Sequence, residues 1–207
     1  MTDAVTTDGV TTDEDLDESR RRFLGIATGA TGAVAAGLLA VPFLGSLKPS
    51  ARAQALGAPV QINIESLQPG QVARAQWRGR TVYVVRRDEA MLERVKQMEP
   101  QLSDPESKAS DQPEYALNEF RSVKPEVLVV FGQCTHLGCA PAPRFDVQPA
   151  DLGSEWFGGF FCACHGSKFD MAGRVLAGVP APKNLEIPPY RFVGESVIEV
   201  GTDTGAA

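Results

Sequence analysis

All four cysteines and both histidines of this 207-residue chain lie in two short segments. Residues 134–139 read CTHLGC and residues 162–167 read CACHGS, so each segment supplies two thiols and one imidazole. Thiolates and imidazoles are the side chains that bind zinc, copper and iron–sulfur centres. Because the rest of the chain has neither residue type, we expect these six side chains to form one site.

Three kinds of site could use these residues. A zinc site takes four ligands and would leave two of the six side chains unexplained. Two plain disulfides would account for the cysteines but not for the histidines among them. A 2Fe–2S centre of mixed ligation uses all six, because two cysteines bind one iron, two histidines bind the other, and the remaining cysteines form a disulfide.

The two motifs resemble the cluster-binding loops of Rieske proteins in cytochrome bc complexes. The resemblance gives each of the six residues a role: iron ligands Cys134, His136, Cys162 and His165, and a disulfide between Cys139 and Cys164. Many members of the family have proline between the second pair of cysteines, whereas this chain has Ala163. That difference removes some rigidity from the loop but no ligand.

Three further features belong to the same resemblance. The segment containing Gly178, Pro180 and Pro182 resembles the family's proline loop, which covers the cluster from a third side, so the cluster-binding part spans about 132–182. Ser167 resembles a serine whose hydroxyl donates to a cluster sulfur and raises the reduction potential. At Phe169 many respiratory relatives have a tyrosine that donates to a ligand cysteine, and its loss predicts a lower potential.

The N-terminal part of the chain predicts a membrane anchor. Residues 1–19 are acidic with little to bury, which predicts a disordered tail. Arg20 and Arg21 lie in SRRRFL, which resembles a twin-arginine export signal. The chain is then uncharged from residue 23 to residue 47, long enough at about 1.5 Å per residue to cross a hydrocarbon core of about 30 Å. We therefore predict a signal and retained transmembrane helix over residues 20–47, although residues 51–53 resemble a cleavage site.

The rest of the chain predicts a linker and a mainly β domain. Residues 48–59 are rich in alanine and predict a flexible hinge linker. In residues 60–207, short runs rich in Val, Ile and aromatic residues alternate with Gly and Pro, which predicts an antiparallel β fold. The expected strands are 60–64, 72–77, 81–86, 127–131, 157–161, 167–169, 185–187 and 197–200.

One helix and a long excursion interrupt the predicted strands. Asp88 is a candidate N-cap for a helix over residues 89–99, with Leu92, Val95 and Met98 as its apolar stripe. Residues 100–122 are polar and predict an excursion between strands. Together with the helix, this excursion resembles an insertion in proteobacterial bc1 subunits.

The resemblance implies the iron–sulfur subunit of a quinol–cytochrome c reductase. Such a subunit takes one electron and a proton from quinol, with His165 facing the quinol, and passes the electron to a c-type cytochrome. The implied partners are the cytochrome b and c-type cytochrome subunits of a dimeric complex. The implied location is the bacterial inner membrane with the Rieske domain in the periplasm, where a disulfide is stable.

Two other classes of function differ from this one. An exported Rieske subunit of another enzyme, such as arsenite oxidase, can share the export signal and the disulfide. Binding to nucleic acid is not expected, because the formal net charge is −6 and no basic stripe is present.

Overall fold

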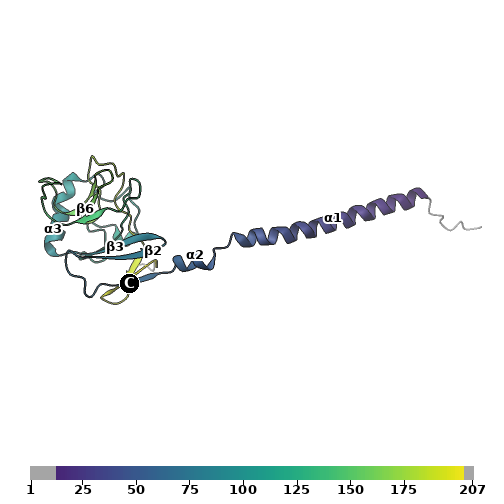
Figure 1. Cartoon of the computed structure of the whole chain (residues 1–207), viewed down its shortest axis with the longest axis horizontal. Helices are drawn as coiled ribbons and strands as arrows, with labels where there is room; N and C mark the ends of the chain where they lie inside the picture. The colour runs from purple at the N-terminus through teal and green to yellow at the C-terminus, as the bar shows by residue number, and fades with distance from the viewer. Residues whose placement is uncertain (1–12, 203–207) are drawn as a thin grey trace, which may run out of the picture. The chain divides into compact units, whose positions relative to one another are not determined.

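The computed structural model describes residues 13–202. The chain divides into two compact units, residues 1–52 and residues 53–207. The first contains the long helix α1, and the second, which we call the head domain, contains all the strands (Figure 1). The predicted fold class, a mainly antiparallel β domain preceded by a long apolar helix, is confirmed.

Helix α1 (Asp13–Ser46) presents an apolar surface with no partner among the described residues. The side chains of Leu38 and Phe43 are 71% and 73% exposed. The segment Asp17–Leu56 contains a window of mean hydropathy 1.8, so it is long and apolar enough to cross a membrane. An exposed apolar surface of this extent fits the predicted anchor.

The prediction of a disordered tail is wrong for residues 13–19, which belong to α1. Residues 1–12 lie outside the described part of the chain. The physical reason for the helix over residues 13–19 is local. Arg21 donates to the carboxylate of Asp17, one turn earlier, at 3.3 Å. Acidic groups near a helix N-terminus and i, i+4 ion pairs both favour a helix without any burial.

A second short helix, α2 (Ala51–Leu56), lies inside the segment predicted as a flexible linker. Three of its six residues are alanine, the residue with the highest helix propensity. The Leu56 carbonyl accepts a hydrogen bond from Arg78 N–H at 3.2 Å, which ties the end of α2 to the head domain. Residues 48–59 are therefore partly helical, and their flexibility stays a prediction.

Three antiparallel sheets of three strands make up the described head domain. The first has the order β2 (Val72–Trp77), β3 (Arg80–Arg86), β4 (Val127–Phe131). The second has the order β1 (Val60–Asn63), β9 (Val197–Val200), β8 (Tyr190–Phe192). The third has the order β5 (Ala142–Arg144), β6 (Gly159–Cys162), β7 (Ser167–Phe169).

One predicted strand is absent and two short strands were not predicted. Residues 185–187 do not form a strand because their backbone hydrogen bonds go to three different segments. Leu185 N–H donates to the Gly173 carbonyl at 2.8 Å. The Glu186 carbonyl accepts from Phe131 N–H at 2.9 Å, whereas Ile187 N–H donates to the Asp111 carbonyl at 3.1 Å. Strands β5 and β8 have three residues each, too few for a periodic pattern in the sequence.

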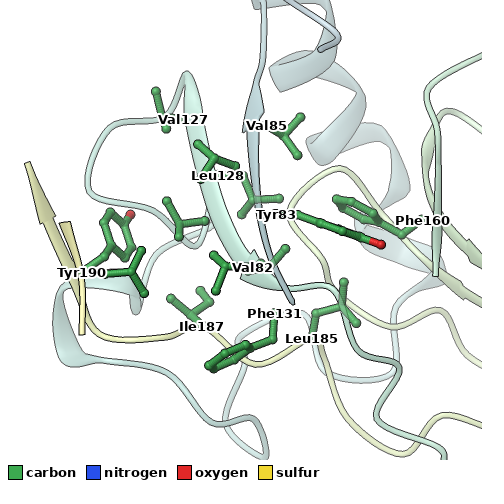
Figure 2. Packing of buried hydrophobic residues seen from close by; sticks show 14 of the residues in the cluster. Val82, Tyr83, Val85, Val127, Leu128, Phe131, Phe160, Leu185, Ile187 and Tyr190 are labelled. Carbon is green, nitrogen blue, oxygen red and sulfur yellow. The ribbon is translucent and has the colours of Figure 1, made fainter. Parts of the chain in front are cut away.

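The main hydrophobic core of the head domain is built around strands β3 and β4 of the first sheet. Every residue of β4 is buried, and β3 contributes four consecutive buried residues. Figure 2 shows Tyr83 of β3 lying against Phe160 of β6, with their ring centroids 6.2 Å apart. Leu185 and Ile187 pack near Phe131 in the same view. This packing joins the first sheet to the third, and loops leaving β4 and β6 carry the candidate ligands.

Helix α3 (Glu89–Met98) follows β3, with Asp88 as its N-cap as predicted. The Asp88 carboxylate accepts from Met91 N–H at 2.8 Å. The buried stripe consists of Met91, Val95 and Met98, so the prediction of Leu92 is wrong; Leu92 is only half-buried. Between α3 and β4 the described chain forms two short 3-10 helices, η1 (Glu99–Gln101) and η2 (Glu114–Ala116).

Candidate metal centre

The first cysteine–histidine motif lies in the loop that follows β4. Cys134 N–H donates to the Cys139 carbonyl at 2.7 Å, and Gly138 N–H donates to the Cys134 carbonyl at 2.9 Å. Gly138 has a φ of +83°, a conformation that glycine adopts at little cost. These bonds close residues 134–139 into a compact loop on a buried strand.

The second motif is the connection between β6 and β7. Cys162 and Ser167 are paired in the register of the two strands, and Gly166 N–H donates to the Cys162 carbonyl at 2.9 Å. The tip of this connection carries Cys164 and His165, both of which are exposed. The hairpin therefore holds one cysteine in the interior and presents a histidine at the surface.

The structure brings all six side chains together. A disulfide joins Cys139 of the first loop to Cys164 of the second. Cys134 and Cys162 carry free thiols and are buried. The imidazole rings of the two histidines are nearly perpendicular, at 87°, with their centroids 4.8 Å apart, one from each loop: His136 and His165.

Two observations indicate a metal-ligand arrangement. Burial raises the pKa of the Cys134 thiol, and the neighbouring Cys162 side chain raises it further, so the two free thiols face each other. The Nδ1 atom of His136 is buried without a hydrogen-bond partner, one of only two such side-chain atoms in the described part of the chain. Buried polar atoms are normally paired, and an unpaired imidazole nitrogen beside two buried thiols is suited to a metal.

The positions of the cysteine sulfurs bear on the zinc alternative. The sulfurs of Cys139, Cys162 and Cys164 lie within 4.8 Å of one another. Two of these sulfurs are bonded to each other, and metal binding requires a thiolate. Two free thiols and two imidazoles remain, a set that suits either tetrahedral zinc or a mixed-ligand 2Fe–2S cluster.

Ser167 lies between the proline loop and the first ligand loop. Its side chain is buried, and its hydroxyl oxygen accepts from Ala181 N–H at 3.1 Å. The hydroxyl also lies beside the Cys134 thiol and lowers the pKa of that thiol, although burial acts more strongly in the opposite direction. Ser167 is thus placed to stabilise negative charge on the Cys134 sulfur.

This contact predicts the effect of removing the hydroxyl. We expect Ser167→Ala to lower the reduction potential by about 60 mV or more, since a hydrogen bond to a charged group contributes about 1.5–3 kcal/mol and tenfold in a one-electron equilibrium is about 59 mV. An EPR-monitored redox titration measures the shift. Ser154→Ala, which removes an exposed hydroxyl, is the control. An unchanged potential in Ser167→Ala would contradict the predicted role of this serine.

Phe169 and the proline loop are the remaining features that the sequence predicts near the two ligand loops. Phe169 is fully buried, and its backbone forms a bridge with Val175. A phenylalanine ring has no hydroxyl to donate. The lower reduction potential expected of a chain with Phe169 in place of tyrosine stays a prediction. In the proline loop, Pro180 and Pro182 are exposed, while Ala181 between them is buried.

Arg80, which the sequence did not single out, braces the base of the first loop. It donates to Gln133 Oε1 at 2.8 Å and makes a two-fold contact with the Glu186 carboxylate at 2.9 and 2.6 Å. Its guanidinium also lies 3.5 Å from the centroid of the Phe131 ring. No local pattern could reveal these contacts, because the partners lie 51 to 106 positions away: Phe131, Gln133 and Glu186.

Comparison with known proteins gives the same division of the chain. Residues 59–190 match the family model described as Rieske [2Fe-2S] domain. Residues 10–50 match the model described as Ubiquitinol-cytochrome C reductase Fe-S subunit TAT signal, and this match includes Arg20 and Arg21. The Rieske match favours the 2Fe–2S cluster over zinc.

Curated relatives match along nearly the whole chain. The ubiquinol-cytochrome c reductase iron-sulfur subunit of Allochromatium vinosum is 50% identical over 192 residues, covering 93% of this chain and 93% of the relative. The subunit of the same name from Bradyrhizobium diazoefficiens is 36% identical over 184 residues, covering 88% and 94%. That from Cereibacter sphaeroides is 38% identical over 193 residues, covering 91% and 98%. The chain belongs to the Rieske 2Fe–2S family, and within it to the iron–sulfur subunits of ubiquinol–cytochrome c reductase.

Proposed function

We propose that this chain is the electron-accepting subunit of a quinol–cytochrome c reductase and that His165 is the residue that meets quinol. The observation that carries the proposal is the position of His165. Its side chain is exposed at the tip of the β6–β7 connection and lies against the half-buried His136. Of the two histidines, His165 is therefore the one more open to a substrate from outside the head domain.

The ligand set follows from the arrangement of the two loops. Cys134 and Cys162 would hold one iron, and His136 and His165 would hold the other. When bound, the 2Fe–2S cluster supplies a one-electron acceptor whose potential is raised by its neutral imidazole ligands. The disulfide between Cys139 and Cys164 holds the two loops together beside these ligands.

The protein's own part in the reaction is the handling of a proton. With one ring nitrogen of His165 bound to metal, the other nitrogen can accept a hydrogen bond from a quinol hydroxyl and then its proton. An imidazole suits this role because a ring nitrogen without a proton can accept one. The chain thus offers quinol a proton acceptor next to the electron acceptor.

The partners and location follow from the same proposal. A subunit of this kind works with a cytochrome b subunit, which takes the second electron of quinol, and with a c-type cytochrome, within a dimeric complex. Helix α1 would remain as a single membrane anchor in the bacterial inner membrane. The head domain would lie in the periplasm, an oxidising compartment that suits its disulfide.

Affinity purification through a tag on this chain, from membranes of cells that express it, tests the proposal. We expect b- and c-type haem to copurify and the preparation to reduce cytochrome c when quinol is supplied. Copurification of a molybdenum enzyme instead, with no haem b, would contradict the proposal and support an electron-transfer role in an enzyme such as arsenite oxidase.

The linker over residues 48–59 is proposed to let the head domain move between the quinol site and the c-type cytochrome. Replacing residues 53–55 with proline would break α2 and stiffen the segment. We expect steady-state quinol–cytochrome c turnover to fall severalfold while the EPR spectrum of the cluster stays unchanged. Gln54→Ala, which preserves the helix, is the control, and unaltered turnover in the proline variant would show that linker motion does not limit the reaction.

A further inference from the structure

The first stem of the proline loop is paired with the excursion between α3 and β4. Residues 175–177 lead into the loop, and residues 101–103 run antiparallel to them. Two backbone hydrogen bonds join the segments, from Ser103 N–H to the Val175 carbonyl (3.0 Å) and from Ala177 N–H to the Gln101 carbonyl (2.8 Å). The excursion is thus joined to one side of the loop by a single antiparallel β-bridge.

The second stem is held by Asn184, whose side chain is buried (1% exposed). Its Oδ1 accepts from Val175 N–H at 2.7 Å, which joins the two stems. Its Nδ2 donates to the Asp104 carbonyl at 3.0 Å and to Ser107 Oγ at 2.9 Å. Its own backbone N–H donates to Ser110 Oγ at 3.1 Å. Asn184 therefore fastens both stems to the excursion.

The acceptors that Asn184 uses are themselves ordered by Asp104. The Asp104 carboxylate accepts from Lys108 N–H at 2.8 Å and from Ala109 N–H at 3.0 Å. It also accepts from the Ser110 hydroxyl at 2.9 Å, which orients that oxygen toward Asn184. We call the polar turn over residues 104–110 the socket, because its oxygen atoms accept three hydrogen bonds from Asn184.

Both connections from the proline loop to the ligand loops start within three residues of Asn184. Ala181 N–H donates to Ser167 Oγ, and the Ser167 side chain lies beside Cys134. The hydroxyl of Thr135, the residue after Cys134, donates to the Lys183 carbonyl at 2.6 Å. A displacement of this segment would therefore change the contacts of one candidate iron ligand.

We propose that Asn184 is a positioning residue of the metal centre: the excursion, acting through Asn184, holds the proline loop where Ala181 keeps the Ser167 hydroxyl on Cys134. The inference rests on the 2Fe–2S site of the proposed function but not on quinol oxidation. It also gives the excursion a role, because the socket for Asn184 lies entirely within it.

Asn184→Leu tests the proposal, since leucine has nearly the same size, carries no charge and makes none of the three side-chain hydrogen bonds. Asn118→Leu is the matched control. Asn118 lies in the same excursion and its side-chain amide also donates two hydrogen bonds, but both acceptors are carbonyls of its own segment: Tyr115 (3.1 Å) and Ser122 (2.9 Å). Ser110→Ala removes one contact with Asn184 together with the bond from Ser110 to Asp104, and it serves if Asn184→Leu fails to fold.

Two measurements are made on the full-length chain with its cluster, in detergent. The first is the reduction potential, followed by EPR. We expect Asn184→Leu to lower it, Ser110→Ala to lower it less, and Asn118→Leu to leave it unchanged. The second is the rate of tryptic cleavage after Lys183, because Thr135 holds its carbonyl and Ser110 holds the next N–H. We expect cleavage to accelerate about tenfold or more in Asn184→Leu, since the three side-chain hydrogen bonds that hold this segment are lost.

A double variant tests whether Asn184 changes the reduction potential through Ser167. If Asn184 acts through Ser167, then adding Asn184→Leu to Ser167→Ala should lower the potential no further. An equal additional fall would overturn the proposed path. Faster cleavage with an unchanged potential in Asn184→Leu would also overturn the proposal, because the loop would then be freed without any effect on the metal centre. None of these readouts requires quinol, so they fail or succeed independently of the proposed function.

Discussion

Replacing Cys139 and Cys164 together with alanine is expected to lower the free energy of unfolding by roughly 3.5 kcal/mol, the entropy that closing a loop of 25 residues removes from the unfolded chain. The expected functional loss is larger, because this disulfide is the covalent link between the two ligand loops. Without it the loops can separate, and we expect most of the cluster to be lost during purification.

The loss of cluster is measured as iron and acid-labile sulfide per chain. Stability is measured by denaturant unfolding, followed through the chain's two tryptophans, Trp77 and Trp156, both of which are buried. Leu137→Ala is the control, since this side chain lies in the first loop but is 71% exposed and should change the unfolding free energy by less than about 0.5 kcal/mol. A double variant that keeps full cluster content would show that the ligand loops are held by other contacts.

Asp170→Ala is expected to destabilise the head domain by about 3–5 kcal/mol, because it leaves buried cations without their counter-charge. The Asp170 carboxylate accepts from Arg174 Nε at 2.7 Å, and both side chains are almost completely buried. Two further arginines, Arg87 and Arg121, are buried nearby, and desolvation lowers the pKa of each to about 10 while Asp170 partly offsets that effect. Both therefore remain charged at neutral pH and depend on this carboxylate.

An exposed ion pair provides the control for Asp170→Ala. Asp151→Ala removes a carboxylate that pairs with Arg144 at 2.9 Å but is 60% exposed. Exposed pairs contribute about 0–1 kcal/mol, so we expect a small change in the denaturant midpoint. Equal losses in the two aspartate variants would show that burial of the Asp170 pair does not determine its contribution.

The six residues of the metal centre could be predicted because they lie in two short motifs whose residue types leave few alternatives. The strands β2, β4, β7 and β9 could be predicted for a similar reason, since runs of apolar residues bounded by Gly and Pro are local signals. What could not be predicted is the long-range polar network. The contact of Asn184 with Asp104 spans 80 positions, and a single buried asparagine has no pattern that reveals its partner.

The errors also have local physical causes. The acidic composition of residues 13–19 predicts disorder, but the i, i+4 ion pair favours a helix there. The alanine content of residues 51–56 favours the helix α2 within the predicted linker. The shift of the α3 stripe from Leu92 to Met91 arises because Val95 and Met98 can form a stripe with either residue. Only packing against the rest of the head domain decides between them.

The most direct test of the mixed-ligand 2Fe–2S site uses the fact that the chain contains only two histidines. The full-length chain is produced with 15N-labelled histidine, reduced, and measured by pulsed EPR. The ligation described here predicts two strongly coupled 15N nuclei, one from His136 and one from His165, and the loss of that signature in a variant lacking either. A reduced cluster with no coupled histidine nitrogen, or an EPR-silent chain containing one zinc ion, would contradict it.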